Sequence, residues 1–154
     1  MSKAVLASLL VSLSAQGQEV VFLVRHAEKL DSSKDTRLSP KGEERAKALA
    51  AKLKDAGVTA IYTSEFRRAQ ETAKPLADAL GLTPKVHPAS DSKGLVELLK
   101  KEGGRALVVG HANTVPEIVR MYGGKLGELR EDEFDGLFLV ARSPEGFRLV
   151  TLRQ

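Results

Sequence analysis

The sequence contains no cysteine, and that absence excludes several kinds of chemistry. Disulfide frameworks, thiolate nucleophiles and zinc sites with thiolate ligands all require cysteine. Aromatic residues make up only 5% of the chain and tryptophan is absent, although the formal net charge is +4. Because the lysines and arginines alternate with acids along helical patterns, the basic charge favours a solvated surface over a nucleic-acid partner.

The chain also lacks an apolar run long enough for a stable membrane span. Residues 1–18 contain one early charge, Lys3, then an uncharged run from Ala4 to Leu13, then small and polar residues. This layout is typical of a secretory signal peptide and predicts export to the periplasm or the exterior. The alternative is an apolar N-terminal segment of a cytoplasmic protein. Residues 19–154 are expected to form a single domain.

Apolar runs alternate with helical patterns along the rest of the chain. Strands are expected at Val20–Val24, Val58–Thr63, Pro84–His87, Arg105–Gly110, Leu137–Ala141 and Phe147–Thr151. Helices are expected at Pro40–Ala56, Ser64–Leu80, Lys93–Lys101 and Thr114–Tyr122. The alternation predicts an α/β fold with three layers, α/β/α, around a mostly parallel sheet of about six strands that ends in an antiparallel hairpin. Pro75 is expected to kink or split the second helix.

Two of the expected strands end in a histidine. The first runs into Arg25 and His26, and the fourth runs into His111. Ligands of open α/β sheets bind at the carboxyl ends of the strands, so the two imidazoles can converge on one anion. If the second strand lies beside the first, as sequential strands usually do, the helix that begins at Ser64 adds an arginine and a helix N-terminus to the same edge. This group predicts a pocket for a phosphoryl group.

An imidazole nitrogen can attack phosphorus while arginines hold the oxygens, and this chemistry requires no metal ion or other cofactor. A metal site formed by His26, Glu28 and His111 is a competing interpretation, although neighbouring arginines oppose a cation. Read singly, each residue also has a structural explanation. An arginine after a strand is often a surface ion pair, and a lone histidine often a hydrogen-bonded core residue.

Four segments carry sequence motifs in a fixed order. They are Val24–Glu28 (Val-Arg-His-Ala-Glu), Leu38–Gly42 (Leu-Ser-Pro-Lys-Gly), Ser64–Ala73 (Ser-Glu-Phe-Arg-Arg-Ala-Gln-Glu-Thr-Ala) and Val109–Thr114 (Val-Gly-His-Ala-Asn-Thr). They resemble the Arg-His-Gly/Ala, Leu-Ser/Thr-x-x-Gly, Ser-x-Leu-x-Arg-Ala-x-x-Thr-Ala and Gly-His-x-Asn-Thr motifs of the histidine phosphatase superfamily. The resemblance is to a short bacterial form with the phosphoglycerate mutase-like fold, and it covers most of residues 20–154.

The resemblance implies a role for each matching residue. His26 would be the nucleophile that becomes phosphorylated. The phosphoryl oxygens would be held by Arg25, Arg68 and His111. Further substrate contacts would come from the backbone N–H groups of Ala112 and Asn113.

Two points of the resemblance need a choice between residues. Arg68 is preferred to Arg67 as the phosphate ligand because it directly precedes Ala69, as in the family motif. Many family members also use a carboxylic acid to protonate the leaving group. Asp91 and Glu28 are the candidates here, although neither lies in a recognisable motif.

The leading prediction is a metal-independent phosphomonoester hydrolase that acts through phosphohistidine on a small phosphorylated substrate, with inorganic phosphate as product or inhibitor. Two alternatives are a non-catalytic phosphate-binding or phospho-ligand-binding module on the same fold and a protein-phosphohistidine phosphatase. A mutase is less favoured because a chain this short has no room for a covering lid. Substrate choice is expected to lie in the loops Leu30–Arg37, Pro88–Lys93 and Lys125–Asp135.

Overall fold

The computed structural model describes residues 19–154. The predicted signal segment, residues 1–18, lies outside the described residues and stays a prediction. In chain order the elements are β1 (Val20–Arg25), α2 (Pro40–Leu53), β2 (Ala60–Thr63), α3 (Arg67–Leu80), β3 (Lys85–Val86), α4 (Ser92–Glu102), β4 (Arg105–Gly110), α5 (Thr114–Met121), β5 (Gly136–Ser143) and β6 (Gly146–Arg153). Within residues 19–154, no helix combines the length and the apolar character that a membrane crossing requires.

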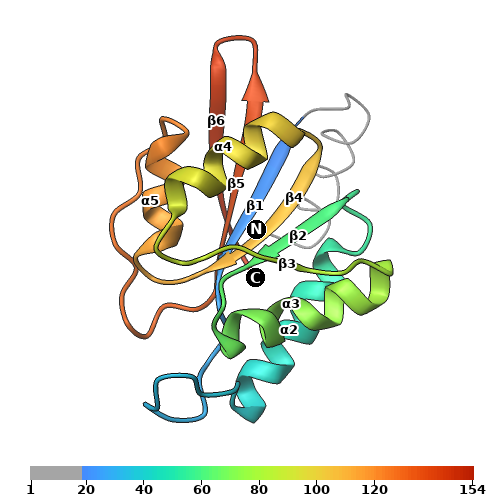
Figure 1. Ribbon diagram of the computed structural model, residues 1–154, viewed down its shortest axis with the longest axis vertical. Coiled ribbons are helices and arrows are strands. Elements are labelled where there is room, and N and C mark those ends of the chain that lie inside the picture. Colours follow the sequence, from blue (N-terminus) through green and yellow to red (C-terminus); the bar gives the residue numbers. More distant parts are fainter. Residues whose placement is uncertain (1–18) are drawn as a thin grey trace.

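The six strands form one mixed sheet with the order β3-β2-β4-β1-β5-β6 (Figure 1). The first four of these strands are parallel to their neighbours. β5 is antiparallel to β1, and β6 is antiparallel to β5, so the chain finishes in a hairpin at one edge of the sheet. The predicted α/β sheet of six strands with a C-terminal antiparallel hairpin is therefore confirmed.

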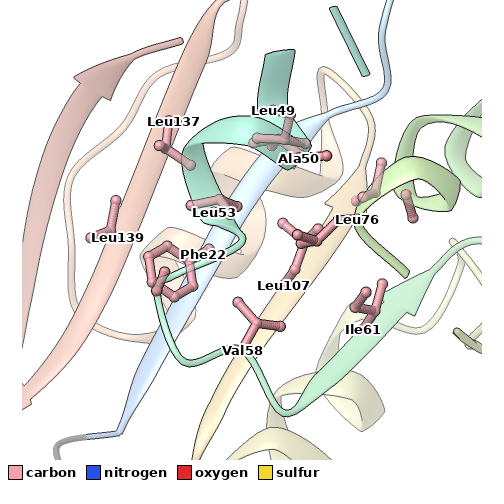
Figure 2. Packing of buried hydrophobic residues seen from close by; sticks show 14 of the residues in the cluster. Phe22, Leu49, Ala50, Leu53, Val58, Ile61, Leu76, Leu107, Leu137 and Leu139 are labelled. Atoms are coloured by element: carbon pink, nitrogen blue, oxygen red, sulfur yellow. The ribbon is translucent and has the colours of Figure 1, made fainter. Parts of the chain in front are cut away.

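Helices cover both faces of this sheet because the strands present apolar side chains to both. On one face Phe22 and Leu107 pack with leucines of α2 and α3, as Figure 2 shows. On the other face Val21, Leu23 and Val108 pack with residues of α4 and α5, which lie in front of the sheet in Figure 1. Successive residues of a strand point to opposite faces, so a fully apolar strand such as β1 supplies both cores at once.

The expectation that β2 lies beside β1 is wrong, because β4 lies between them. All six residues of β4 and all six of β1 are buried, whereas β2 has four residues and begins with the half-buried Ala60. Strands that are apolar on both faces gain most from the centre of a sheet, and this preference outweighs the tendency of sequential strands to pair. The end of β2 still reaches the same edge as the ends of β1 and β4.

Two helices differ from their expected bounds by more than one residue at an end. α2 ends at Leu53 rather than at Ala56, and α3 begins at Arg67 rather than at Ser64. α3 also runs from Arg67 to Leu80 as one helix with Pro75 inside it, so the expected split does not occur. Buried residues on both sides of the proline, such as Ala73 and Leu76, hold the two halves of α3 against the sheet.

Candidate active site

His26 and His111 lie side by side at the carboxyl edge of the sheet. β1 and β4 are adjacent and parallel, with Arg25 paired to Gly110, and the His26 N–H donates to the Gly110 carbonyl at 2.8 Å. The histidine that follows each strand therefore emerges at the same level. The two ring centroids are 5.2 Å apart, and only 3% of His26 and 9% of His111 is exposed.

The His26 ring is neutral, with its proton on one defined nitrogen. Its Nδ1 lies 2.7 Å from the carbonyl oxygen of Ala27, and because a carbonyl can only accept, Nδ1 carries the hydrogen. The pKa of His26 is lowered to about 3, chiefly by burial; the Ala27 hydrogen bond raises it, and the nearby His111, Arg25 and Arg68 lower it. At neutral pH the Nε2 atom therefore has a free lone pair, which is what a nucleophile requires.

His111 is held by two hydroxyl groups. Its Nε2 lies 2.7 Å from Ser64 Oγ, and its backbone N–H donates to Thr114 Oγ1 at 2.9 Å. Burial lowers the pKa of His111 to about 4, and Arg68 lowers it further. Ser64 begins the turn between β2 and α3, so this contact fixes His111 against the turn that leads into α3. Both imidazoles are neutral hydrogen-bonding groups at pH 7.

The loop that leads into β5 binds the guanidinium of Arg25. Its Nη1 donates to the carbonyl oxygens of Arg130, Glu131 and Glu133 at 3.1, 2.8 and 3.1 Å. The Phe134 ring covers the guanidinium, with Cζ 4.0 Å from the ring centroid. The Arg25 Nε atom is buried and has no hydrogen-bond partner within residues 19–154.

Arg68 shows the same arrangement at the other side of the site. Its Nη1 donates to the Lys34 carbonyl at 3.0 Å, and its Cζ lies 4.5 Å from the centroid of the Phe66 ring. Its buried Nε has no hydrogen-bond partner in the described part of the chain. Arg67 instead points to solvent, where its side chain is 57% exposed and pairs with Glu71 at 2.7 Å. The structure thus brings Arg68, and not Arg67, to the two histidines.

Thr72 ties the first turn of α3 to the end of β1. Its hydroxyl accepts from the Ala27 N–H at 2.9 Å and donates to the Arg68 carbonyl at 2.7 Å. The residue is buried. One side chain therefore sets the distance between the segment that carries His26 and the turn that carries Arg68.

The two carboxylates suggested by the sequence are engaged elsewhere. Arg45 donates two hydrogen bonds to Glu28, at 2.7 and 3.0 Å. Burial raises the pKa of Glu28, but these bonds outweigh it and the pKa falls below its ordinary value. Asp91 caps α4 by accepting from the Gly94 N–H at 3.0 Å, and this bond holds the pKa of Asp91 low. Both side chains are therefore ionised at neutral pH.

Glu65 is the carboxylate that interacts electrostatically with His111 and Arg68. It is exposed, and its Oε2 accepts from the Ala89 N–H at 2.8 Å, which lowers the pKa of Glu65 and joins the start of α3 to the loop before α4. The competing interpretation of a metal site requires Glu28 beside the two histidines, but Glu28 pairs with Arg45 instead. Residues 19–154 contain no group of three or more His, Asp or Glu side chains arranged to hold a metal ion.

Ala112 and Asn113 follow His111 directly and lead into α5. Ala112 is half-buried and its carbonyl accepts from the Leu129 N–H at 3.5 Å. Asn113 is exposed, stands at the N-cap of α5 and makes no side-chain capping bond. Both therefore stand next to the histidine pair, at the start of a helix whose N-terminus favours anions.

The geometry and the sequence motifs agree with one known family. A sequence model of the histidine phosphatase superfamily (branch 1) matches residues 21–91, which contain the first three of the four motifs. Over residues 21–91, the chain therefore matches the histidine phosphatase superfamily.

The sequence relatives of this segment are named as probable phosphoglycerate mutases. A 69-residue segment is 41% identical to the "Probable phosphoglycerate mutase GpmB" of Yersinia enterocolitica, and it covers 40% of this chain and 32% of that protein. The GpmB of an Enterobacter strain is 37% identical over 68 residues, with the same coverage. The matched part therefore spans about a third of these curated relatives.

Solved structures of histidine phosphatases share the fold over nearly their whole length. The protein histidine phosphatase SixA, in complex with tungstate, superimposes with a TM-score of 0.71 at 21% identity, covering 87% of this chain and 96% of that one. A mycobacterial glucosyl-3-phosphoglycerate phosphatase gives 0.70 at 16% identity, covering 88% and 98%. Identities this low show a common fold and nothing finer.

The structure also explains the second of the four motifs, whose side chains do not join the two histidines and two arginines. In Leu38–Gly42, the Ser39 N–H and hydroxyl both donate to the Glu28 carbonyl, and the Ser39 hydroxyl accepts from the Gly42 N–H at 3.1 Å. A Cβ at Gly42 would collide with that same carbonyl oxygen. The motif therefore packs the first turn of α2 against the segment after His26.

Four residues of this site, Ser64, Phe66, Thr72 and Phe134, were not assigned a role from the sequence. Ser64 lies in the third motif, so its position could have been noticed, but its contact with His111 depends on the strand order. Phe66 and Phe134 each cover a guanidinium. Phe134 sits in the acidic loop before β5, where no motif or periodicity distinguishes it.

Proposed function

We propose that this chain is a metal-independent phosphomonoester hydrolase that acts through a phosphohistidine at His26. One observation carries the proposal. His26 is a buried, neutral imidazole, and the two arginines beside it each have a buried Nε. Among the described residues, no group forms a hydrogen bond with the His26 Nε2 or with either arginine Nε. Buried N–H groups without partners are costly, and oxyanion oxygens are the acceptors that arginine matches best.

The reaction that these groups support has two displacements. Nε2 of His26 attacks phosphorus, the bond from phosphorus to the leaving oxygen breaks, and the leaving group departs with the electron pair and takes up a proton. Water then attacks the phosphohistidine, the P–N bond breaks, and inorganic phosphate leaves as a proton returns to solvent. Arg25, Arg68 and the neutral His111 would stabilise the charge on the equatorial oxygens in both steps.

The state of the carboxylates bears on the substrate. Glu28, Glu65 and Asp91 all have pKa values below their ordinary range, so none is a protonated acid at neutral pH. Leaving groups that need little protonation, such as phenolates, carboxylates or the imidazole of phosphohistidine, are therefore expected to react better than simple alkoxides.

The test is hydrolysis of p-nitrophenyl phosphate in excess EDTA, together with an acid quench and a base quench for the phosphoprotein. We expect turnover that EDTA does not change and an acid-labile, base-stable intermediate. His26→Ala should lower kcat about a thousandfold or more and abolish the intermediate. His87→Ala, which removes the third histidine of the chain, should still form the phosphoprotein intermediate. A phosphoprotein that persists in His26→Ala would overturn the nucleophile assignment.

A second candidate is a phosphate-binding module without turnover, which the lack of a carboxylic acid at the site favours. Inorganic phosphate should then raise the melting temperature while no phosphate is released from any monoester. Turnover of p-nitrophenyl phosphate that His26→Ala abolishes would exclude this candidate.

Two narrower activities rest on neighbours. The likeness in fold and size to SixA favours a protein-phosphohistidine phosphatase, whose leaving group also needs no strong acid. The match to GpmB suggests a mutase as another activity. Comparing the rate of phosphoglycerate isomerisation with the rate of phosphate release would distinguish a mutase from a hydrolase. Export, predicted from residues 1–18, remains a proposal, and fractionation of cells that express the tagged chain would test it.

A further inference from the structure

Two of the five phenylalanines lie at the phosphoryl pocket, and each contacts one arginine and one histidine. Phe134 covers Arg25 at 4.0 Å, and its ring meets His26 edge-on at a centroid distance of 6.1 Å. Phe66 covers Arg68 at 4.5 Å and meets His111 edge-on at 5.3 Å with an interplanar angle of 81°. The site is thus flanked by two equivalent sets of phenylalanine, arginine and histidine.

Each guanidinium is fixed in two ways that leave the same nitrogen free. A guanidinium is planar, with two faces and N–H groups along its edges. In both arginines an aromatic ring covers one face and Nη1 donates to loop carbonyls, three for Arg25 and one for Arg68. In both, Nε is buried and unpartnered among the described residues. The ring and the carbonyls together determine where that nitrogen points.

We propose that Phe66 and Phe134 are positioning residues that hold the guanidinium groups of Arg68 and Arg25 in the orientation that binds the phosphoryl oxygens. The inference rests on the proposed function, because it names how that pocket is ordered before a ligand arrives. A preorganised donor loses less conformational entropy on binding than a free one, so the rings contribute to affinity without contacting the ligand.

Neither ring has the surroundings of a core residue. Both phenylalanines are only half-buried, and neither belongs to the apolar clusters that α2, α3, α4 and α5 form with the sheet. Phe147 is the contrast. It packs against the second of these clusters, stacks edge-on with Tyr122 at 4.8 Å and covers Arg142 at 5.0 Å, on the hairpin. It is therefore a matched control with an arginine contact but no link to the pocket.

Leucine separates the role of the aromatic face from that of apolar bulk. The family motif that Ser64–Ala73 resembles has leucine at the position of Phe66. Leucine keeps an apolar side chain beside the guanidinium but lacks the π face that attracts a cation. Measured cation–π contributions correspond to a loss of about two- to thirtyfold in affinity when the attraction is removed.

The rings also keep water from the histidines, which gives a second readout. Burial is the largest cause of the low pKa of His26 and of His111. Opening one side of an imidazole to solvent should move its pKa back toward 6.5. The acid limb of the pH–rate profile should therefore shift to higher pH in Phe134→Leu, an effect that a purely structural side chain would not produce.

The experiment is calorimetric titration of the full chain with inorganic phosphate, for wild type, Phe66→Leu, Phe134→Leu and Phe147→Leu. We expect the two pocket variants to bind phosphate about two- to thirtyfold more weakly, with melting temperatures close to that of Phe147→Leu. Phe147→Leu should bind within twofold of wild type. Phe134→Tyr, which keeps the ring, should restore most of the affinity.

Three outcomes would overturn the inference. The first is phosphate affinity in the pocket variants equal to that of Phe147→Leu. The second is failure of both leucine variants to fold, because the rings would then be core residues. The third is a wild type that binds no phosphate. A wild type that binds phosphate in a ring-dependent manner but hydrolyses no monoester supports the inference and refutes the hydrolase alone.

Discussion

Replacement of Thr72 by valine tests the connection between the nucleophile segment and the first turn of α3. Valine has nearly the same shape but cannot form hydrogen bonds, and only 3% of Thr72 is exposed, so no water replaces the hydroxyl. The Ala27 N–H, on a residue with no exposed surface, loses its acceptor, and the Arg68 carbonyl loses one donor. An orphaned buried N–H costs about 1–3 kcal/mol and the second bond about 1 kcal/mol more. We expect Thr72→Val to lower the free energy of unfolding by about 2–4 kcal/mol.

Urea unfolding followed by circular dichroism measures this change, and Thr63→Val is the matched control. Thr63 is equally buried, at 2% exposed, but its hydroxyl only donates to the Ser64 carbonyl at 3.0 Å. Its loss orphans no N–H group, so we expect a cost of about 1 kcal/mol. Equal costs for the two variants would refute the reasoning, because they would mean that the Ala27 N–H does not depend on Thr72.

Three further outcomes follow from single contacts. Arg68→Ala should lower kcat/KM about a hundredfold or more, whereas Arg67→Ala should change it less than about threefold; the reverse order in steady-state assays would shift the motif by one residue. Burial raises the pKa of Glu28, but its hydrogen bonds and the charges of Arg45 and Lys41 together keep the pKa below the ordinary value of 4.5. The stability that wild type gains over Glu28→Gln should therefore be present above about pH 4.5 and shrink as the pH falls. Urea unfolding at about pH 3 and pH 7 measures it, and an equal difference at both contradicts it. Gly42→Ala should lower stability by about 1–3 kcal/mol through its collision with a carbonyl, while Gly127→Ala, which meets nothing within 4 Å, should change the melting temperature little.

The order and type of the elements could be predicted because each one carries a local signal. Ser39 and Pro40 define the start of α2, where Ser39 accepts from the Gly42 N–H and Pro40 is the first helical residue. Gly81 closes α3 with a left-handed φ of 66°. The strand order could not be obtained in this way. It depends on which strands gain most from a central position, and that is a property of the assembled sheet.

The same division applies to the site. His26 and His111 could be brought together in advance because both follow apolar parallel strands, and strand ends of that kind share one edge. Phe134 could not, because its ring reaches Arg25 only through the path of the loop before β5. The engagement of Glu28 with Arg45 was equally hidden, since the two residues are 17 positions apart and belong to no shared motif.

The pairing of β1 with β4 sets the spacing of the two backbone segments that carry the imidazoles. Adjacent strands of a sheet lie about 4.8 Å apart, and the ring centroids of His26 and His111 are separated by 5.2 Å. The distance between the two histidines therefore follows the spacing of adjacent strands in the sheet. Engineering this scaffold for a larger transferred group would require a bulge at a strand end rather than a new side chain. In contrast, the loop whose carbonyls contact Arg25 can be redesigned without changing the strand spacing.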